Sequence, residues 1–423
     1  MRFAGDYVRR VVDDELDELF PSLPAVLLDG PKGVGKTATA LQRSRTVRRL
    51  DMPDERGVVE ADPMVVGLDA PPVLVDEWQR VPEVFDAVRR LVDADPTGGR
   101  FLLTGSAPTT STHSGAGRIT TIRMRPLTLP ERLDLAPTVS MKALLRGDAN
   151  VHGRCDLTLA EYVEEITASG FPGLRNLAPR ARDRQLDSYI DRIIDHDLPE
   201  LGHAVRRPEV VRAWLRAYAA ATASTASFES IRNAATSGVS DKPAKTTTGP
   251  YIALLERLRI LDPLEAWLPT TNHFTTLGTS PKHYLADPAL ATRLLRVSAA
   301  RLIQGETPDI VIPRDGTFLG AAFEALVALS VRTFAQRNDA RTYHLRTHGG
   351  RHEVDFIVET THGIIAIEVK LSGAVTSSDV EHLLWLRRQS AVDCIDTVLV
   401  NTGREAYRRK DGVAVIPLAL LGP

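Results

Sequence analysis

The chain has 423 residues, of which 43% are hydrophobic and 25% are charged, and its formal net charge is −2. This composition is ordinary for a globular protein, and the length predicts two to four domains of roughly 100–200 residues each. The near-neutral charge excludes a global attraction to nucleic acid, so any such binding needs a local basic patch.

The cysteines and the apolar runs indicate the compartment. Cys155 and Cys394 are the only cysteines and lie far apart, which argues against a disulfide framework and a cysteine-based zinc site. We expect no membrane contact, because no apolar run approaches the ~18 residues of a spanning helix. Residues 1–19 lack the apolar core of a signal peptide. These features predict a cytoplasmic protein.

A phosphate-binding loop is the first predicted site. A hydrophobic run ending at Asp29 leads into a G-x-x-x-x-G-K-T motif. Its glycines let backbone N–H groups point at phosphates, while Lys36 reaches the β- and γ-phosphates and the Thr37 hydroxyl binds Mg²⁺. Residues 38–45 predict the helix whose N-terminus faces the anion. A glycine-rich turn without a ligand is the alternative. The predicted ATP-binding residues are Gly30, Pro31, Lys32, Gly33, Val34, Gly35, Lys36 and Thr37.

Two carboxylates follow the next buried strand, residues 73–76. Ligands of open α/β sheets bind outside the carboxyl ends of the strands. Asp76 is therefore predicted to hold Mg²⁺ or its water, and Glu77 to polarise the water that attacks the γ-phosphate. The alternative is a solvated helix start with Asp76 as its N-cap.

Hydroxyl groups end a third strand, residues 101–104. Thr104 or Ser106 could sense the γ-phosphate, although Thr-Gly-Ser is also ordinary turn chemistry. Further on, Arg118 could reach a phosphate in its own or a neighbouring subunit. The alternative for Arg118 is a solvated loop arginine.

Four regions are predicted along the chain. Strands at 24–29, 46–51, 73–76, 101–104 and 120–125 place a P-loop parallel-sheet ATPase domain at residues 1–135. Residues 136–205 form a helical connecting region that includes a helix at 185–201. Residues 206–295 form a winged-helix-like domain, and residues 296–423 form a C-terminal α/β domain.

The third region has the element order of a winged helix. Helices at 209–221, after Ser227 and at 251–258 precede short extended segments at 260–264 and 267–268. DNA is a candidate partner, and the alternative is a helical spacer or a protein-contact module. The basic residues on or beside the third helix are Lys242, Lys245, Arg257 and Arg259.

The last region carries a second group of charged residues. Two apolar strands, 353–358 and 364–370, contain Asp355 and the pair Glu368 and Lys370. Two carboxylates on adjacent strands can share a divalent cation, and the lysine can activate water or stabilise phosphate charge. The alternative is a buried Glu368–Lys370 salt bridge in a fold that does not cut. Glu324 is the charge within an upstream apolar helix at 318–331.

Taken together, the motifs resemble a known family. GPKGVGKT, VLVDEWQ and LLTGSA are similar to the AAA-type ATPase domain of bacterial and archaeal ATP-binding proteins of unknown function. In that family the domain is joined to a winged helix and a restriction-endonuclease-like fold, which GFPGL, PKHYLADPAL, EVDFIV and IEVKLS resemble. The resemblance implies that the nuclease-like site corresponds to Glu324, Asp355, Glu368 and Lys370.

The predicted function is a Mg²⁺-dependent ATPase whose nucleotide state controls a DNA-facing winged-helix and nuclease-like module. The alternative is a non-catalytic, nucleotide-dependent switch that binds a protein or DNA partner. A homo-oligomer is left open by the sequence.

Overall fold

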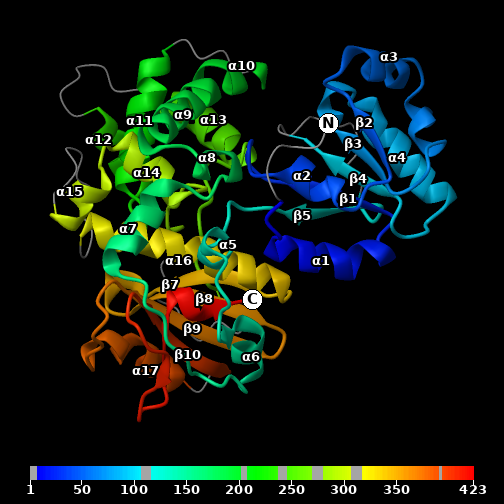
Figure 1. The fold of residues 1–423 in the computed structure, drawn as a ribbon. Helices are drawn as coiled ribbons and strands as arrows, with labels where there is room; N and C mark the ends of the chain where they lie inside the picture. Colours follow the sequence, from blue (N-terminus) through cyan, green and yellow to red (C-terminus); the bar gives the residue numbers. More distant parts are fainter. Residues whose placement is uncertain are drawn as a thin grey trace.

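The computed structural model describes residues 7–105, 116–201, 207–236, 245–268, 280–305, 317–389 and 393–423. In Figure 1, the N-terminal sheet (blue to cyan) lies beside a group of green and yellow helices, and the C-terminal sheet (orange to red) lies below that group. The long helix α16 (Phe318–Arg337) runs between the helices and the C-terminal sheet. The chain therefore has the mixed α/β architecture that the sequence predicts.

The N-terminal sheet is parallel, with strand order β2-β3-β4-β1-β5. All five predicted strands are present: β1, β3 and β4 are largely buried apolar runs, as is typical of a parallel sheet, whereas the edge strands β2 and β5 carry polar residues. β4 separates β1 from β3, so the carboxyl ends of these three strands lie side by side. The strands are β1 (Ala25–Asp29), β2 (Thr46–Arg49), β3 (Val73–Asp76), β4 (Phe101–Thr104) and β5 (Ile119–Arg123).

Helices cover this sheet on both sides in Figure 1. They are α1 (Val11–Leu19), α2 (Lys36–Leu41), α3 (Pro53–Ala61) and α4 (Glu83–Ala94). The helix predicted at 38–45 is wrong at both ends: α2 begins at Lys36 and ends at Leu41. It has to end there because β2 begins only a few residues later, at Thr46.

Helices dominate the middle of the chain. The helix predicted at 185–201 begins earlier, at Pro179, and contains a π-helical turn, Ile193–Asp197, between α9 and α10. The helices are α5 (Leu129–Leu133), α6 (Met141–Arg146), α7 (Leu159–Ala168), α8 (Pro172–Arg175), α9 (Pro179–Arg192), α10 (Leu198–Glu200), α11 (Pro208–Ala220), α12 (Phe228–Ala235), α13 (Lys245–Arg257), α14 (Pro288–Leu294) and α15 (Ala299–Ile303).

Extended segments follow α13. Two isolated antiparallel bridges pair Leu261 with Leu285 and Leu264 with Lys282. Helices α11, α12 and α13 follow the predicted order, but the extended segments predicted at 260–264 and 267–268 pair with other parts of the chain, the first with residues 282–285 and the second with His344. The assignment of this region as a winged helix stays a prediction. Lys242 and the side chain of Lys245 lie outside the described residues.

The C-terminal sheet has strand order β11-β12-β10-β9-β8-β7. The predicted antiparallel pairing of β8 with β9 is confirmed. At the end of the chain, β13 (Leu421–Gly422) pairs with β6 (Val139–Ser140), so part of the predicted connecting region joins the C-terminal end. The remaining elements are β7 (Arg341–Arg346), β8 (Glu353–Thr360), β9 (Gly363–Lys370), α17 (Glu381–Arg387), β10 (Cys394–Asn401), β11 (Tyr407–Arg408) and β12 (Ala414–Pro417).

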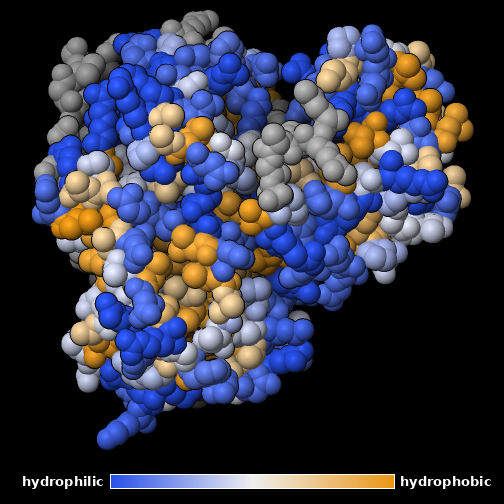
Figure 2. All heavy atoms as spheres, viewed as in Figure 1, coloured by the Kyte–Doolittle hydropathy of each residue, from blue (hydrophilic) through white to orange (hydrophobic). Residues whose placement is uncertain are grey.

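Helix α16 corrects the expectation that no apolar run approaches the length of a membrane-spanning helix. It has 20 residues and a mean hydropathy of 1.5 in its most apolar window, so by length and composition alone it could cross a membrane. However, 72% of that window is buried, which is typical of a core helix. Figure 2 accordingly shows a largely hydrophilic face on which apolar residues form small groups.

Candidate functional site

The phosphate loop connects β1 to α2, and two of its glycines are needed for its shape. Gly35 has φ +103° and precedes the first turn of α2, a left-handed conformation that favours glycine. A β-carbon on Gly30 would collide with the carbonyl oxygen of Met124, just beyond β5. The motif therefore forms the strand–loop–helix unit that the sequence predicts.

Lys36 points back into this loop. Its Nζ donates hydrogen bonds to the carbonyl oxygens of Gly30 (2.7 Å) and Pro31 (2.9 Å). Burial lowers the pKa of Lys36 to about 8, and the negative charges of Glu77 and Asp29 oppose this shift. The ammonium group is thus held where the phosphates of a nucleotide would meet the loop.

Two hydroxyl groups donate hydrogen bonds to Asp76, at the carboxyl end of β3. Its Oδ1 accepts hydrogen bonds from Thr37 Oγ1 at 2.8 Å and from Thr104 Oγ1 at 2.5 Å. Asp76 and Thr104 are register partners on β3 and β4. A carboxylate and two hydroxyls are oxygen ligands of the kind that Mg²⁺ takes in phosphate sites, so these residues fit the predicted ion.

Glu77 has a strained backbone directly beyond β3. Its φ and ψ are 56° and 42°, the left-handed region, which is costly for a residue with a β-carbon and often marks functional sites. Its carboxylate accepts a hydrogen bond from Gln79 Nε2. The other two candidates add little: Ser106 lies outside the described residues, and Arg118 pairs with Asp93 at 2.8 Å on the surface.

The helical region contacts the loop through Lys32. Its Nζ lies 2.7 Å from Asp197 Oδ1, and the Tyr189 hydroxyl donates to the Lys32 carbonyl oxygen at 3.1 Å. Asp197 belongs to the π-helical turn, a local widening that often occurs at functional sites. Asp197 could not be predicted as a site residue, because a π-turn has no clear sequence signature.

A second contact joins the end of β1 to the residues beyond α13. Arg259 Nη2 lies 2.6 Å from Asp29 Oδ2, directly before the phosphate loop. Arg259 was predicted on or beside the third helix of a unit that could contact DNA; it does lie directly beyond α13, but its guanidinium group pairs with Asp29 at the end of β1. Arg257 is exposed on α13.

Asp262 also lies where the ends of β1 and β5 meet the residues beyond α13, a region that we call the junction. It pairs there with several arginines. It forms ion pairs with Arg125 and Arg332, both at 2.9 Å, and with Arg123 at 3.6 Å. Burial opposes ionisation, but the charges of Arg125 and Arg332 hold the pKa of Asp262 far below its usual value. Since Arg332 is on α16, this helix is tied to the end of β5.

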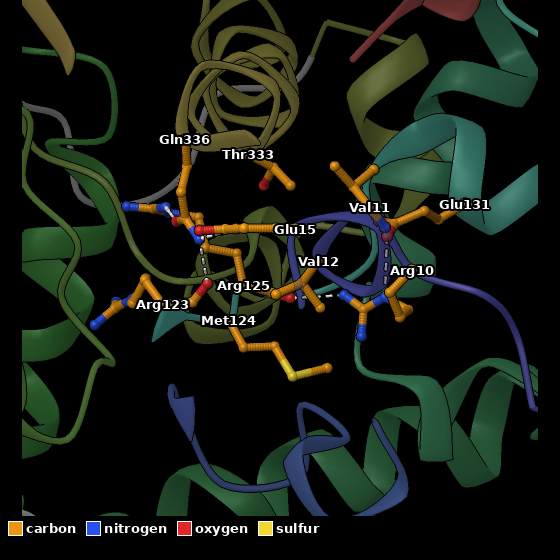
Figure 3. Close-up of a pocket in the computed structure, with 10 residues that line it drawn as sticks. All are labelled: Arg10, Val11, Val12, Glu15, Arg123, Met124, Arg125, Glu131, Thr333 and Gln336. Carbon is orange, nitrogen blue, oxygen red and sulfur yellow. Dashed lines mark hydrogen bonds and ion pairs between the residues drawn. The ribbon is translucent and has the colours of Figure 1, made fainter. Parts of the chain in front are cut away.

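A small cavity borders the junction, and Figure 3 shows the side chains that line it, from α1, α5 and α16 and from residues at and just beyond the end of β5. Gln336 Nε2 donates to Glu15 Oε2 (2.9 Å) and to the carbonyl oxygen of Arg123 (2.8 Å). Burial lowers the pKa of Arg123 to about 9, while the charge of Asp262 opposes the shift. The junction therefore consists of polar side chains that are joined by hydrogen bonds and ion pairs.

The C-terminal candidates are brought together around a residue that sequence reasoning missed. Lys282 Nζ lies 2.8 Å from Asp355 Oδ1 and 2.9 Å from Glu324 Oε1. Tyr284 donates its hydroxyl proton to the same oxygen of Glu324. The PKHYLADPAL segment contains Lys282 and Tyr284, but nothing in its spacing predicts this contact.

Glu368 and Lys370 form the predicted pair on β9. Lys370 Nζ lies 2.9 Å from Glu368 Oε1, whereas Glu368 Oε2 is buried without a hydrogen-bond partner among the described residues. Burial, and then the charge of Asp355, raises the pKa of Glu368 well above its usual value. Within the described ranges, no group of three or more His, Cys, Asp or Glu side chains is arranged to hold a metal ion.

Comparisons with known proteins agree with the N-terminal motifs. A family model described as an AAA domain matches residues 22–133, and two described as domains of unknown function match residues 159–301 and 319–421. The chain is 26% identical over 407 residues to uncharacterized proteins of Mycobacterium bovis and Mycobacterium tuberculosis, covering 93% of this chain and 80% of each relative. The N-terminal part of the chain is therefore an AAA-type ATPase domain.

Proposed function

We propose that the chain is a Mg²⁺-dependent ATPase whose nucleotide state is passed to its helical and C-terminal parts. The observation that carries this proposal is the convergence of the Thr37 and Thr104 hydroxyls on one oxygen of Asp76. This arrangement joins the phosphate loop to the carboxylate at the end of β3, as metal-assisted phosphoryl transfer requires.

Each residue has a distinct role in this reaction. Lys36 and the loop N–H groups bind the phosphates, and Thr37 and Asp76 would hold Mg²⁺, which neutralises phosphate charge when bound. Glu77 orients a water molecule and accepts its proton as the water oxygen bonds to the γ-phosphorus. The bond from that phosphorus to the β–γ bridging oxygen breaks, which gives ADP and phosphate. Thr104 is positioned to contact the γ-phosphate.

The nucleotide state would pass from the ATPase domain to the helical region first through Asp29. This residue directly precedes Gly30 and pairs with Arg259, which follows α13. A shift of the loop on nucleotide binding would change that ion pair and, through Lys32 and Asp197, the end of α9. A non-catalytic switch would use the same contacts without turnover, and DNA contact through α13 stays a prediction.

ATP binding tests the proposal directly. Removal of the Lys36 ammonium group by Lys36→Ala should weaken Mg²⁺-ATP binding by at least about tenfold in calorimetry, because a charge-assisted hydrogen bond contributes about 1.5–3 kcal/mol. Lys142→Ala, on the exposed face of α6, is the matched control and should bind as the wild type does. Equal affinity in Lys36→Ala and the wild type would refute the assigned phosphate site.

A further inference from the structure

The carboxylates of the nuclease-like region surround a lysine. Lys282 is 1% exposed and lies within 2.9 Å of Glu324 and Asp355 and 3.4 Å of Glu353. The three acids come from α16 and β8, whereas the lysine comes from the segment that precedes α14. One buried ammonium group therefore joins three separate parts of the chain.

Charge explains why the ammonium group remains there. Burial alone lowers the pKa of Lys282, but the negative charges of Asp355 and Glu324 outweigh this effect and raise it well above its usual value. A buried charge is tolerated only when it is paired. A lysine ammonium is a compact point charge, and surrounding carboxylate oxygens are also the setting that a hard divalent cation requires.

We propose that the ε-ammonium group of Lys282 fills the cation position of this carboxylate cluster, so that the cluster takes no divalent metal ion. Both oxygens of Asp355 are engaged, since Oδ1 accepts from Lys282 and Oδ2 accepts from the Val369 N–H at 2.8 Å. A metal ion at Asp355 would have to displace Lys282 from this carboxylate and would place a second cation beside its buried ammonium group, which is strongly unfavourable.

Glu368 gives the sharpest contrast with a metal site. Among the described residues, its buried Oε2 has no hydrogen-bond partner, but its Oε1 already pairs with Lys370 Nζ at 2.9 Å. The ammonium groups of Lys282 and Lys370 therefore compensate Asp355 and Glu368, so neither carboxylate needs a metal ion to balance its charge. Of the residues predicted as a metal-dependent nuclease site, Asp355 then forms an ion pair that connects the middle region to the C-terminal sheet, and Glu368 pairs with Lys370 within β9.

Mn²⁺ binding to the full-length chain tests this proposal, with Asp76→Asn as a background that removes the metal ligand of the ATPase site. Bound Mn²⁺ is counted by electron paramagnetic resonance, without nucleotide. The background and its Asp355→Asn derivative should bind Mn²⁺ equally, because Lys282 occupies the cluster in both. The Lys282→Ala derivative should gain a site with at least about tenfold higher affinity, and adding Asp355→Asn should abolish that gain.

Two results would overturn the proposal. One is Mn²⁺ binding that depends on Asp355 while Lys282 is present, and the other is a folded Lys282→Ala derivative that gains no Mn²⁺ site. The first comparison does not need the lysine variant to fold. A second readout is DNA cleavage in Mn²⁺ by the unmodified chain: the proposal expects none, and cleavage that Asp355→Asn removes would contradict it.

Discussion

At the scale of single residues, Glu324 and Asp355 share the ammonium group of Lys282, but their pKa values shift in opposite directions. Burial and the charge of Asp355 raise the pKa of Glu324 to about 7, whereas Lys282 outweighs burial and lowers the pKa of Asp355. Glu324 is therefore the carboxyl group of the pair that changes charge near neutral pH. Its raised pKa also means that the folded state favours its protonated form.

This difference predicts a pH effect on stability. The Glu324 contribution should be fully present below the unfolded pKa of about 4.3 and should be lost as pH rises through about 7. Glu324→Gln, which cannot ionise, should lack this loss. We expect the unfolding free energies of variant and wild type, from urea titrations at pH 5 and pH 7, to differ in their pH dependence by at least about 1 kcal/mol.

An exposed glutamate on α7 provides the control for that experiment. Glu164→Gln should follow the wild-type pH dependence. Parallel curves for Glu324→Gln and the wild type would mean that Glu324 does not titrate in this range.

Among whole elements, α16 contacts both candidate sites. Glu324 meets the Lys282 cluster, and Arg332, further along the helix, meets Asp262 at the ATPase junction. The helix is buried along most of its length, so one packed element carries both of these contacts. The contact between Arg259 and Asp29 adds a second connection, from α13 to the phosphate loop.

That second connection predicts a nucleotide effect on α13. ATP should change the amide hydrogen exchange of residues 245–257 in a Glu77→Gln chain, which holds ATP without turnover. Arg259→Ala, which removes the partner of Asp29, should reduce the change by more than half. Arg257→Ala, two residues away and exposed, is the control. An unaltered response in Arg259→Ala would exclude this path.

The elements also show which parts of the fold and of the candidate sites could be predicted from the sequence. Apolar runs predicted β1, β3, β4 and the β8–β9 pair, while the polar edge strands β2 and β5 followed from the alternation of strands and helices. Motif spacing placed Lys36, Thr37 and Asp76 together. Lys282, Asp197 and the role of Arg259 could not be predicted. Each acts through a partner distant in sequence, such as Lys282 with Asp355, and no periodicity encodes such a contact.

On the scale of the whole molecule, Asp262 connects three parts of the chain. It lies in the segment after α13 and pairs with Arg125, beyond β5 of the ATPase domain, and with Arg332 of α16. Asp262→Asn should reduce the free energy of unfolding by about 3–5 kcal/mol at pH 7, because it leaves buried arginines unpaired. As the folded pKa is lowered, the contribution is present above the unfolded pKa of about 3.9 and is lost as pH falls below it.

Denaturant titrations at pH 7 and pH 2 measure this loss, because pH 2 lies well below the unfolded pKa of about 3.9. Asp93→Asn removes an exposed ion pair with Arg118 and should cost less than about 1 kcal/mol. If Asp262→Asn is no more destabilising than this surface control, the junction does not hold the parts of the molecule together.

ATP turnover by the Glu77→Gln chain tests the central claim, that this molecule is an ATPase with a water-orienting residue at the end of β3. Phosphate release in Mg²⁺ should be measurable for the wild type and at least about a hundredfold slower for Glu77→Gln, while calorimetry gives equal ATP affinity for the two. Unchanged turnover in Glu77→Gln, or no turnover in a wild-type chain that binds ATP, would contradict the account.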